Sequence, residues 1–298
     1  MDSGDKDLVG CVLVEIDRLQ LAVPSANLAI ERWEKLLGAE FSDRSVIKCL
    51  GAKVHTLRVG RSEVEILEPD GSGIVADEVA RRGAHMFSAG ASSRDVAQVA
   101  SQLAKITSQA VEEAGRLYVD GASIDIPGLR LVVSPHEERE PVGFIDYLYE
   151  ATVLAGDAVG LTARFAEVFA LDAQAFVTID SPRFGYNGQL TLFKPEELHR
   201  FEVITPLDAD KTMGRFFSKV GPCLYMSFAE TCEIKKIEDL VNEQGLGQTI
   251  DRPIDRSDDL PADQIWLHPP TLGGVMLGLS RPTMAWSWSG SPDRVEPI

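Results

Sequence analysis

Two glutamates stand at matching places in a sequence that nearly repeats itself. Glu65 begins the run Glu-Ile-Leu-Glu-Pro and Glu202 begins the run Glu-Val-Ile-Thr-Pro; His85 lies sixteen residues after the first of these prolines, and Tyr225 nineteen after the second. A carboxylate can remove a proton from a substrate, an imidazole can act as a base or a metal ligand, and a phenol can donate a hydrogen bond to an oxyanion. We interpret the pattern as a duplicated scaffold in which His85 has been exchanged for Tyr225.

These residues are expected on short strands in four similar units. At residues 17–37, 84–103, 145–169 and 224–245, alternating apolar residues lead into a segment with helical spacing. Each helix is followed by segments that predict three strands: 46–50, 53–59 and 63–68; 116–119, 123–126 and 129–134; 176–179, 189–193 and 200–205; 248–251, 264–268 and 275–280. The polar stretch 136–141 is the expected linker between a first half, 1–138, and a second half, 143–298.

One such unit leaves a face of its sheet uncovered, so that two units must pair to enclose a cavity. The expected fold is therefore α+β, with four βαβββ modules forming two curved, barrel-like mixed sheets. Pairing can join consecutive modules, or it can be crossed, the first with the fourth and the second with the third. In either arrangement a curved sheet offers a pocket for a small ligand.

Composition restricts the partners. The chain has 298 residues, 44% of them hydrophobic, and a net charge of -17, which disfavours nucleic acid and anionic membranes. The apolar run from Leu8 to Ile16 is interrupted by Gly10 and Glu15, unlike a signal peptide, and no run approaches the roughly 20 residues of a membrane span. The four cysteines, including Cys11, are scattered and expected as reduced thiols. We predict a cytoplasmic protein with a small-molecule substrate, no nucleic-acid or membrane partner, and a possible homodimeric state.

The arrangement resembles the vicinal oxygen chelate superfamily, which includes glyoxalase I, methylmalonyl-CoA epimerase, extradiol dioxygenases and bleomycin-resistance proteins. The resemblance spans residues 12–288 and rests on Asp-Arg-Leu at 17–19 and Asp-Tyr-Leu at 146–148, where the family usually has Asp-His-Val, and on the repeated glutamate and glycine motifs. It implies a glyoxalase-like fold.

The resemblance also implies where metal-using members would place their ligands. These positions are Arg18, Glu65, His85 and Val132 in the first half, and Tyr147, Glu202, Tyr225 and Gly278 in the second. Arginine is a permanent cation, and valine and glycine have no donor, so that neither half holds a complete set. The expectation is therefore no cofactor; the alternative is a divalent metal such as Fe, Mn or Zn at His85 with Glu202, or at His85 with Glu65.

The leading hypothesis is a metal-independent isomerase, epimerase or lyase acting on a small carbonyl compound. Glu202 first, and Glu65 second, would remove a proton, while Tyr147, Tyr225 or His85 would bind the enolate-like oxygen. Each residue also has a purely structural interpretation: an ion pair for the carboxylates, a core position for the histidine, or space filling for the tyrosines.

Three further residues are candidates for substrate binding. Arg18 could clamp a substrate carboxylate or close the first site by pairing with Glu65, while Trp266 and His268 could form a pocket wall. Alternative functions are a drug-sequestering protein of the bleomycin-resistance type, or a metal-dependent dioxygenase with an irregular site. The Trp-Ser-Trp alternation at 286–288 predicts an extended tail that packs its rings on the barrel.

Overall fold

A computed structural model describes residues 12–298, so that Cys11 and the start of the apolar run at Leu8 lie outside the described residues. The elements of the first half are β1 (Ile16–Ala22), α1 (Asn27–Leu37), β2 (Glu40–Ile47), β3 (Ala52–Val59), β4 (Ser62–Pro69), α2 (Ile74–Arg82), β5 (His85–Ser93), α3 (Val96–Leu103), β6 (Val111–Glu113), β7 (Arg116–Asp120) and β8 (Arg130–Pro135). Those of the second half are β9 (Tyr147–Leu154), α4 (Ala158–Phe169), β10 (Val177–Ser181), β11 (Tyr186–Leu192), β12 (Arg200–Pro206), α5 (Thr212–Val220), β13 (Cys223–Glu230), α6 (Ile234–Glu243), β14 (Gln248–Asp251), β15 (Gln264–Leu267) and β16 (Met276–Ser280).

Each half forms one eight-stranded mixed sheet. The strand orders are β2-β3-β4-β1-β5-β8-β7-β6 and β10-β11-β12-β9-β13-β16-β15-β14. In both sheets the first strands of two consecutive modules pair antiparallel at the centre, β1 with β5 and β9 with β13. Consecutive modules therefore share a sheet, and the crossed alternative is wrong. The predicted glyoxalase-like α+β fold of two curved sheets is confirmed.

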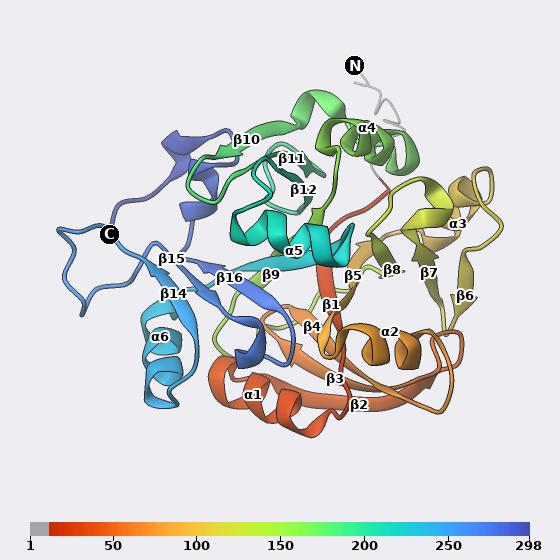
Figure 1. Cartoon of the computed structure of the whole chain (residues 1–298), viewed down its shortest axis with the longest axis horizontal. Coiled ribbons are helices and arrows are strands. Elements are labelled where there is room, and N and C mark those ends of the chain that lie inside the picture. Colours follow the sequence, from red (N-terminus) through yellow and green to blue (C-terminus); the bar gives the residue numbers. More distant parts are fainter. Residues whose placement is uncertain (1–11) are drawn as a thin grey trace, which may run out of the picture.

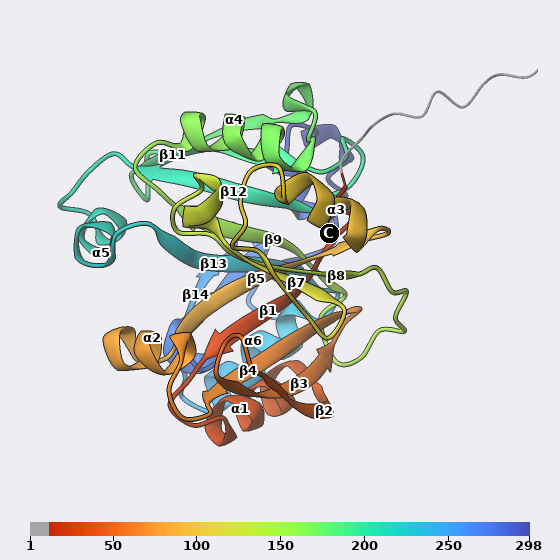
Figure 2. The same ribbon diagram turned by 90° about the vertical axis from the view of Figure 1, so that its right-hand side faces the viewer.

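Helices α1 and α4 pack on the outside of the sheets. In Figures 1 and 2, α1 and α4 lie at opposite ends of the molecule, with the central strands between them. Helix α1 buries Ala29, Trp33, Leu36 and Leu37, the face expected from their spacing. One apolar cluster includes side chains of both halves, among them Leu19 and Val153. The two sheets are thus held by a shared core.

The elements that the sequence did not predict are mostly short. Helix α2 connects the two modules of the first half, and helix α5 connects those of the second. Each helix begins only a few residues after the strand that precedes it. The expected strand at 123–126 is instead a 3₁₀ turn, Gly121–Ile124, because the Asp120 carboxylate accepts a hydrogen bond from the Ala122 N–H and caps it. The tail is also not extended, since Met284–Ser287 is a 3₁₀ turn with Trp286 buried.

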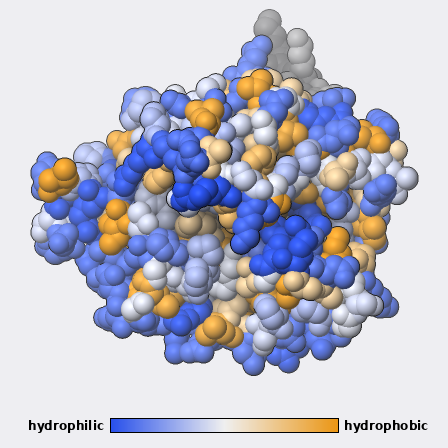
Figure 3. Space-filling view, in the orientation of Figure 1, coloured by the Kyte–Doolittle hydropathy of each residue, from blue (hydrophilic) through white to orange (hydrophobic). Residues whose placement is uncertain are grey.

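The visible surface is mostly hydrophilic. On the face shown in Figure 3, hydrophilic residues predominate and hydrophobic ones are scattered. No helix within residues 12–298 is long and apolar enough to cross a membrane.

Candidate active site

The concave face of the second sheet holds a pocket of about 390 Å³. Half of its lining residues are aromatic or methionine, and its polar and charged residues include Glu202, whose carboxyl is buried. The lining includes Phe184, Tyr186, Glu202, Met213, Tyr225, Met226, Phe228, Trp266, Met276 and Trp288. A largely apolar cavity with a few convergent polar groups is the usual form of a small-molecule site.

Glu202 lies on β12 and has no arginine or lysine partner within residues 12–298. Its Oε2 accepts a hydrogen bond of 2.6 Å from the hydroxyl of Thr152, which faces it on the parallel strand β9. Arg200, two residues earlier on the strand, donates instead to Glu150 at 2.7 Å and to the Leu198 carbonyl at 3.0 Å. Burial, and next the charge of Glu150, raises the pKa of Glu202 well above its ordinary value. The Glu202 carboxyl therefore keeps its proton to a higher pH than an exposed carboxyl does.

Two tyrosines enter the same pocket. Tyr225 lies where the register of β13 against β9 shifts between Leu224 and Met226, and such a bulge turns a side chain away from the regular alternation. Tyr186 comes from the start of β11, and burial followed by the charge of Glu202 raises the pKa of its hydroxyl. Burial also raises the pKa of Tyr225. Both phenols therefore keep their protons and can donate hydrogen bonds to a substrate oxygen.

In the first half, the matching glutamate, Glu65, has a different environment. Glu65 is fully buried and accepts hydrogen bonds from Arg18 at 2.9 Å, Gln20 at 2.7 Å and Arg116 at 2.5 Å. Burial alone would raise the pKa of Glu65, but Arg18 and Arg116 together hold it below its ordinary value. The ion pair between Arg18 and Glu65 that the sequence offered as an alternative is present. Because its oxygens are occupied, Glu65 is not free to take a proton from a substrate.

Glu65 and Glu202 differ in environment because the arginine and the glutamate of a buried ion pair have exchanged strands between the two halves. The strand registers place Arg18 opposite Glu63 in the first sheet, and Glu150 opposite Arg200 in the second. In the first half the arginine stands on the central strand, from which it also reaches Glu65. In the second half the arginine stands on the neighbouring strand β12 and is held by Glu150 of the central strand β9. The glutamate two residues further along β12 is therefore left without a cation.

The strand registers also show that the predicted alignment of the two halves is shifted near His85. Cys223 pairs with Leu154 as His85 pairs with Ala22, so that His85 corresponds to Cys223. Tyr225 corresponds to Phe87, which lies at the matching irregularity in the first sheet. The predicted exchange of His85 for Tyr225 is therefore wrong by two residues.

Of the predicted substrate-binding residues, only Trp266 lines this pocket. His268 donates to or accepts from the Thr249 hydroxyl at 2.9 Å, and Thr249 in turn lines the pocket. Arg18 is buried between Asp17, Glu63 and Glu65, and it cannot reach a substrate.

Two predicted catalytic residues lie elsewhere. Tyr147 lines a separate polar hollow of about 840 Å³ between the halves, with its ring centroid 5.4 Å from that of His199. His85 is bonded to the Gly83 carbonyl at 2.8 Å, and burial lowers its pKa to about 4. Its Nε2 lies 3.9 Å from Glu78, the one carboxylate within ion-pair distance of it among residues 12–298. The structure does not bring Tyr147 or His85 to Glu202, or His85 to Glu65.

Sequence reasoning missed four residues of this site. The sequence assigned no role to Tyr186, Glu150, Thr152 or Arg200. A signal was present, because Glu150 and Arg200 are charged residues inside otherwise apolar strand patterns, where an unpaired charge would be costly. Their pairing with each other requires the strand register, which the sequence does not give.

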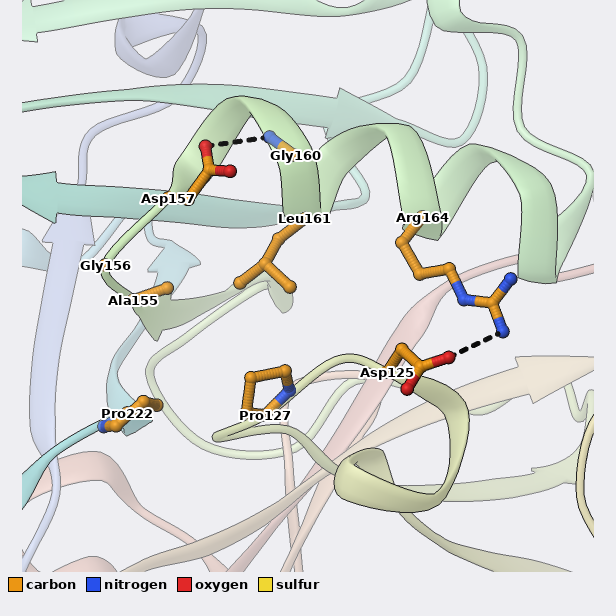
Figure 4. Close-up of a pocket in the computed structure, with 9 residues that line it drawn as sticks. All are labelled: Asp125, Pro127, Ala155, Gly156, Asp157, Gly160, Leu161, Arg164 and Pro222. Carbon is orange, nitrogen blue, oxygen red and sulfur yellow. Dashed lines mark hydrogen bonds and ion pairs between the residues drawn. The ribbon is translucent and has the colours of Figure 1, made fainter.

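Another hollow, of about 470 Å³, lies beside the start of α4. Figure 4 shows its charged groups engaged with their neighbours: Asp157 accepts from the Gly160 N–H as the helix cap, and Arg164 pairs with Asp125 at 3.4 Å. None of the predicted site residues lines it. We therefore place the candidate active site at Glu202.

The chain has the fold of the vicinal oxygen chelate superfamily, as the sequence resemblance predicted. A mutant of 4-hydroxymandelate synthase from Streptomyces coelicolor is similar over 95% of this chain and 100% of its own, with a TM-score of 0.70 and 13% identity. A xylose isomerase-like TIM barrel/4-hydroxyphenylpyruvate dioxygenase fusion protein is similar over 91% of this chain and 50% of its own, with a TM-score of 0.63 and 10% identity. No family model matches the sequence, and no curated protein matches it.

These neighbours contradict the expectation of no cofactor. A dioxygenase activates molecular oxygen, chemistry that a metal or an organic cofactor carries out, so that this neighbour points to a bound cofactor such as a metal.

The donors around Glu202 do not match a common oxygenase site. Such iron sites use two histidines and one carboxylate, whereas the strand positions near Glu202 carry Thr152, Met226 and Gly278. Within residues 12–298, no three His, Cys, Asp or Glu side chains are grouped to hold a metal. The predicted metal pairs of His85 with Glu202 or Glu65 are not formed. The residues of this site therefore do not fit such a metal centre.

Proposed function

We propose that the protein is an enzyme that moves a proton on a small carbonyl-containing substrate bound in the second-half pocket, as an isomerase, epimerase or lyase does. The observation that carries the proposal is Glu202, a buried carboxyl that has no cationic partner in the described part of the chain and faces an apolar cavity. Burying such a group is costly, and perturbed carboxyls in clefts are concentrated at functional sites.

The chemistry follows from the surroundings of Glu202. Its ionised form would take a proton from the carbon next to the carbonyl, and the raised pKa makes it a stronger base than an exposed carboxylate. Tyr186 or Tyr225 would donate a hydrogen bond to the oxygen that becomes enolate-like. The aromatic wall would hold the apolar part of the substrate and exclude water.

Exchange of carbon-bound hydrogen tests this function and does not require that the product be identified. Small ketones, keto acids and thioesters are incubated with the protein in D₂O, and loss of the proton next to the carbonyl is followed by NMR. Glu202→Gln should slow the exchange by about 10²–10⁴-fold, because glutamine cannot accept the proton. Glu65→Gln is the matched control and should retain exchange at a temperature where it is folded. Equal rates for wild type and Glu202→Gln would overturn the proposal.

A second candidate, a metal-dependent oxygenase, is favoured by the fold comparison alone. Its test is the metal content of protein purified without chelator, measured by mass spectrometry, together with oxygen uptake before and after addition of the metal found. Stoichiometric iron with oxygen uptake would replace the proton-transfer proposal.

A further inference from the structure

Glu150 belongs to no pocket described above, yet it contacts both groups that determine the state of Glu202. Its Oε2 accepts from Arg200, and its Oε1 lies 3.5 Å from the Thr152 hydroxyl that donates to Glu202. Glu150, Thr152 and Arg200 are all fully buried. These contacts form a chain from Arg200 through Glu150 and Thr152 to Glu202.

We propose that Glu150 is the positioning residue of the candidate site: by holding Arg200 away from Glu202 it keeps the Glu202 carboxyl uncompensated and able to exchange a proton with a substrate. The inference rests on the proposed function of Glu202. On this inference, a residue that does not touch the substrate determines which half of the protein is active.

In the first half, an arginine does reach the matching glutamate. There Arg18 contacts Glu65 directly, and a second arginine, Arg116, adds to it. Arg200 is near enough to act in the same way, because it stands two residues before Glu202 on β12 and so points to the same side of the strand. Its Nη2 has no hydrogen-bond partner within residues 12–298, so that one donor remains available if Glu150 is lost.

Other charged or titratable groups near Glu202 do not replace Glu150. The phenols of Tyr186 on β11 and Tyr225 on β13 are neutral donors, and the neighbouring β16 side chain in the pocket is Met276. The remaining charged groups of the pocket lining are Asp180, Arg183 and Asp251, of which Arg183 pairs with Asp251 at 3.7 Å and is largely exposed.

Carboxyl NMR tests the inference without a substrate. In full-length protein with ¹³C-labelled glutamate, the side-chain resonance missing from Glu202→Gln identifies Glu202, and its titration midpoint is followed with pH. In Glu150→Gln, the charge of Glu150 that raises the pKa of Glu202 is removed, and Arg200 loses its partner and turns to Glu202, so that the midpoint should fall by about one pH unit or more. In Thr152→Val, the hydrogen bond that favours the ionised form is lost, and the midpoint should rise. If Glu150 and Thr152 had only a structural role, the two variants would not be expected to shift the titration midpoint of Glu202 in opposite directions.

Glu63→Gln is the matched control. Glu63 is the glutamate opposite Arg18 in the first sheet, just as Glu150 is the glutamate opposite Arg200 in the second. Glu63→Gln should leave the Glu202 midpoint unchanged. An unchanged midpoint in folded Glu150→Gln, a fall in Thr152→Val, or a shift in the control would each overturn the inference. If Glu150→Gln does not fold, Glu150→Asp replaces it, because the shorter side chain keeps the charge but releases Arg200, and an unchanged midpoint would again overturn the inference. Because hydrogen exchange on a substrate is not involved, failure here is distinct from failure of the proposed function.

Discussion

At the scale of residues, the two matching glutamates have opposite electrostatic environments. Glu65 is paired with two arginines, whereas Glu202 is bonded to a hydroxyl and lies near another carboxylate. Removing one partner of a buried ion pair leaves an uncompensated charge, while replacing a neutral buried acid by an amide does not. The same change, glutamate to glutamine, should therefore have different effects at the two positions.

We expect Glu65→Gln to lower the free energy of unfolding by about 1–3 kcal/mol at neutral pH, because Arg116 loses its carboxylate partner while Arg18 keeps Asp17 and Glu63. The folded-state pKa of Glu65 is lowered, so that its contribution is present above the unfolded pKa and is lost as pH falls through the folded pKa. The loss on substitution should thus diminish in acid. Urea unfolding from pH 3 to 8 measures it, and a constant loss across that range would contradict the assignment.

Glu202→Gln should instead stabilise the protein at alkaline pH. The folded-state pKa of Glu202 is raised, so that its contribution is present below the unfolded pKa and is lost as pH rises through the folded pKa. Glutamine does not ionise, and the gain should be about 1.4 kcal/mol for each unit of pKa shift. The same urea series extended to pH 9 measures this gain, and an equal loss at all pH values would refute it.

Turnover should depend on the same group. If ionised Glu202 is the base, kcat/KM rises with pH through a pKa well above the ordinary carboxyl value. A rate that is already maximal near pH 5 would show that an ordinary carboxylate acts instead. The hydrogen-exchange assay, repeated across the pH range, provides the measurement.

At the scale of elements, α5 determines part of the pocket wall. Met213 of this helix lines the cavity, and Phe216 packs edge-on against Tyr225 with centroids 5.4 Å apart. The helix can lie there because Gly214 has no side chain: an added Cβ would come within 2.1 Å of the Asp208 carbonyl oxygen. A connecting helix that the sequence pattern did not predict thus contributes to the site.

Gly214→Ala should therefore displace α5 and destabilise the protein by about 1–3 kcal/mol, as overpacking does. Gly156→Ala is the matched control, because its new Cβ would meet only Phe217 at an ordinary 3.7 Å. Urea unfolding gives the stability, and emission from Trp266 and Trp288 reports on the pocket wall. Equal behaviour of the two variants would show that α5 is not held by this contact.

At the scale of the whole molecule, the halves have separate sheets but a common interior. Trp33 of α1 is fully buried and donates to the Leu272 carbonyl of the second half at 3.0 Å. At Gly60, an added Cβ would come within 2.5 Å of the Asp146 carbonyl oxygen. Such contacts across the halves favour a single cooperative unit over two independent domains.

We expect one unfolding transition in urea, with circular dichroism and tryptophan fluorescence changing together. Trp33→Ala should lower the free energy of unfolding by about 3–5 kcal/mol and shift that transition without dividing it. Hydrogen exchange should then increase in β1 and β9 alike. Two separate transitions, with only the first half affected, would contradict a single cooperative unit.

The sequence by itself determined the α+β class, the four modules and most of their strands, because alternating and helical apolar patterns are local properties of the chain. It also indicated Glu202 and Tyr225 as candidate site residues. Only the tertiary structure decided that consecutive modules pair, that Tyr225 corresponds to Phe87, and that Tyr147 and His85 lie away from Glu202. Register and charge pairing depend on strands far apart in the chain, and a shift of a residue or two changes which side chains meet.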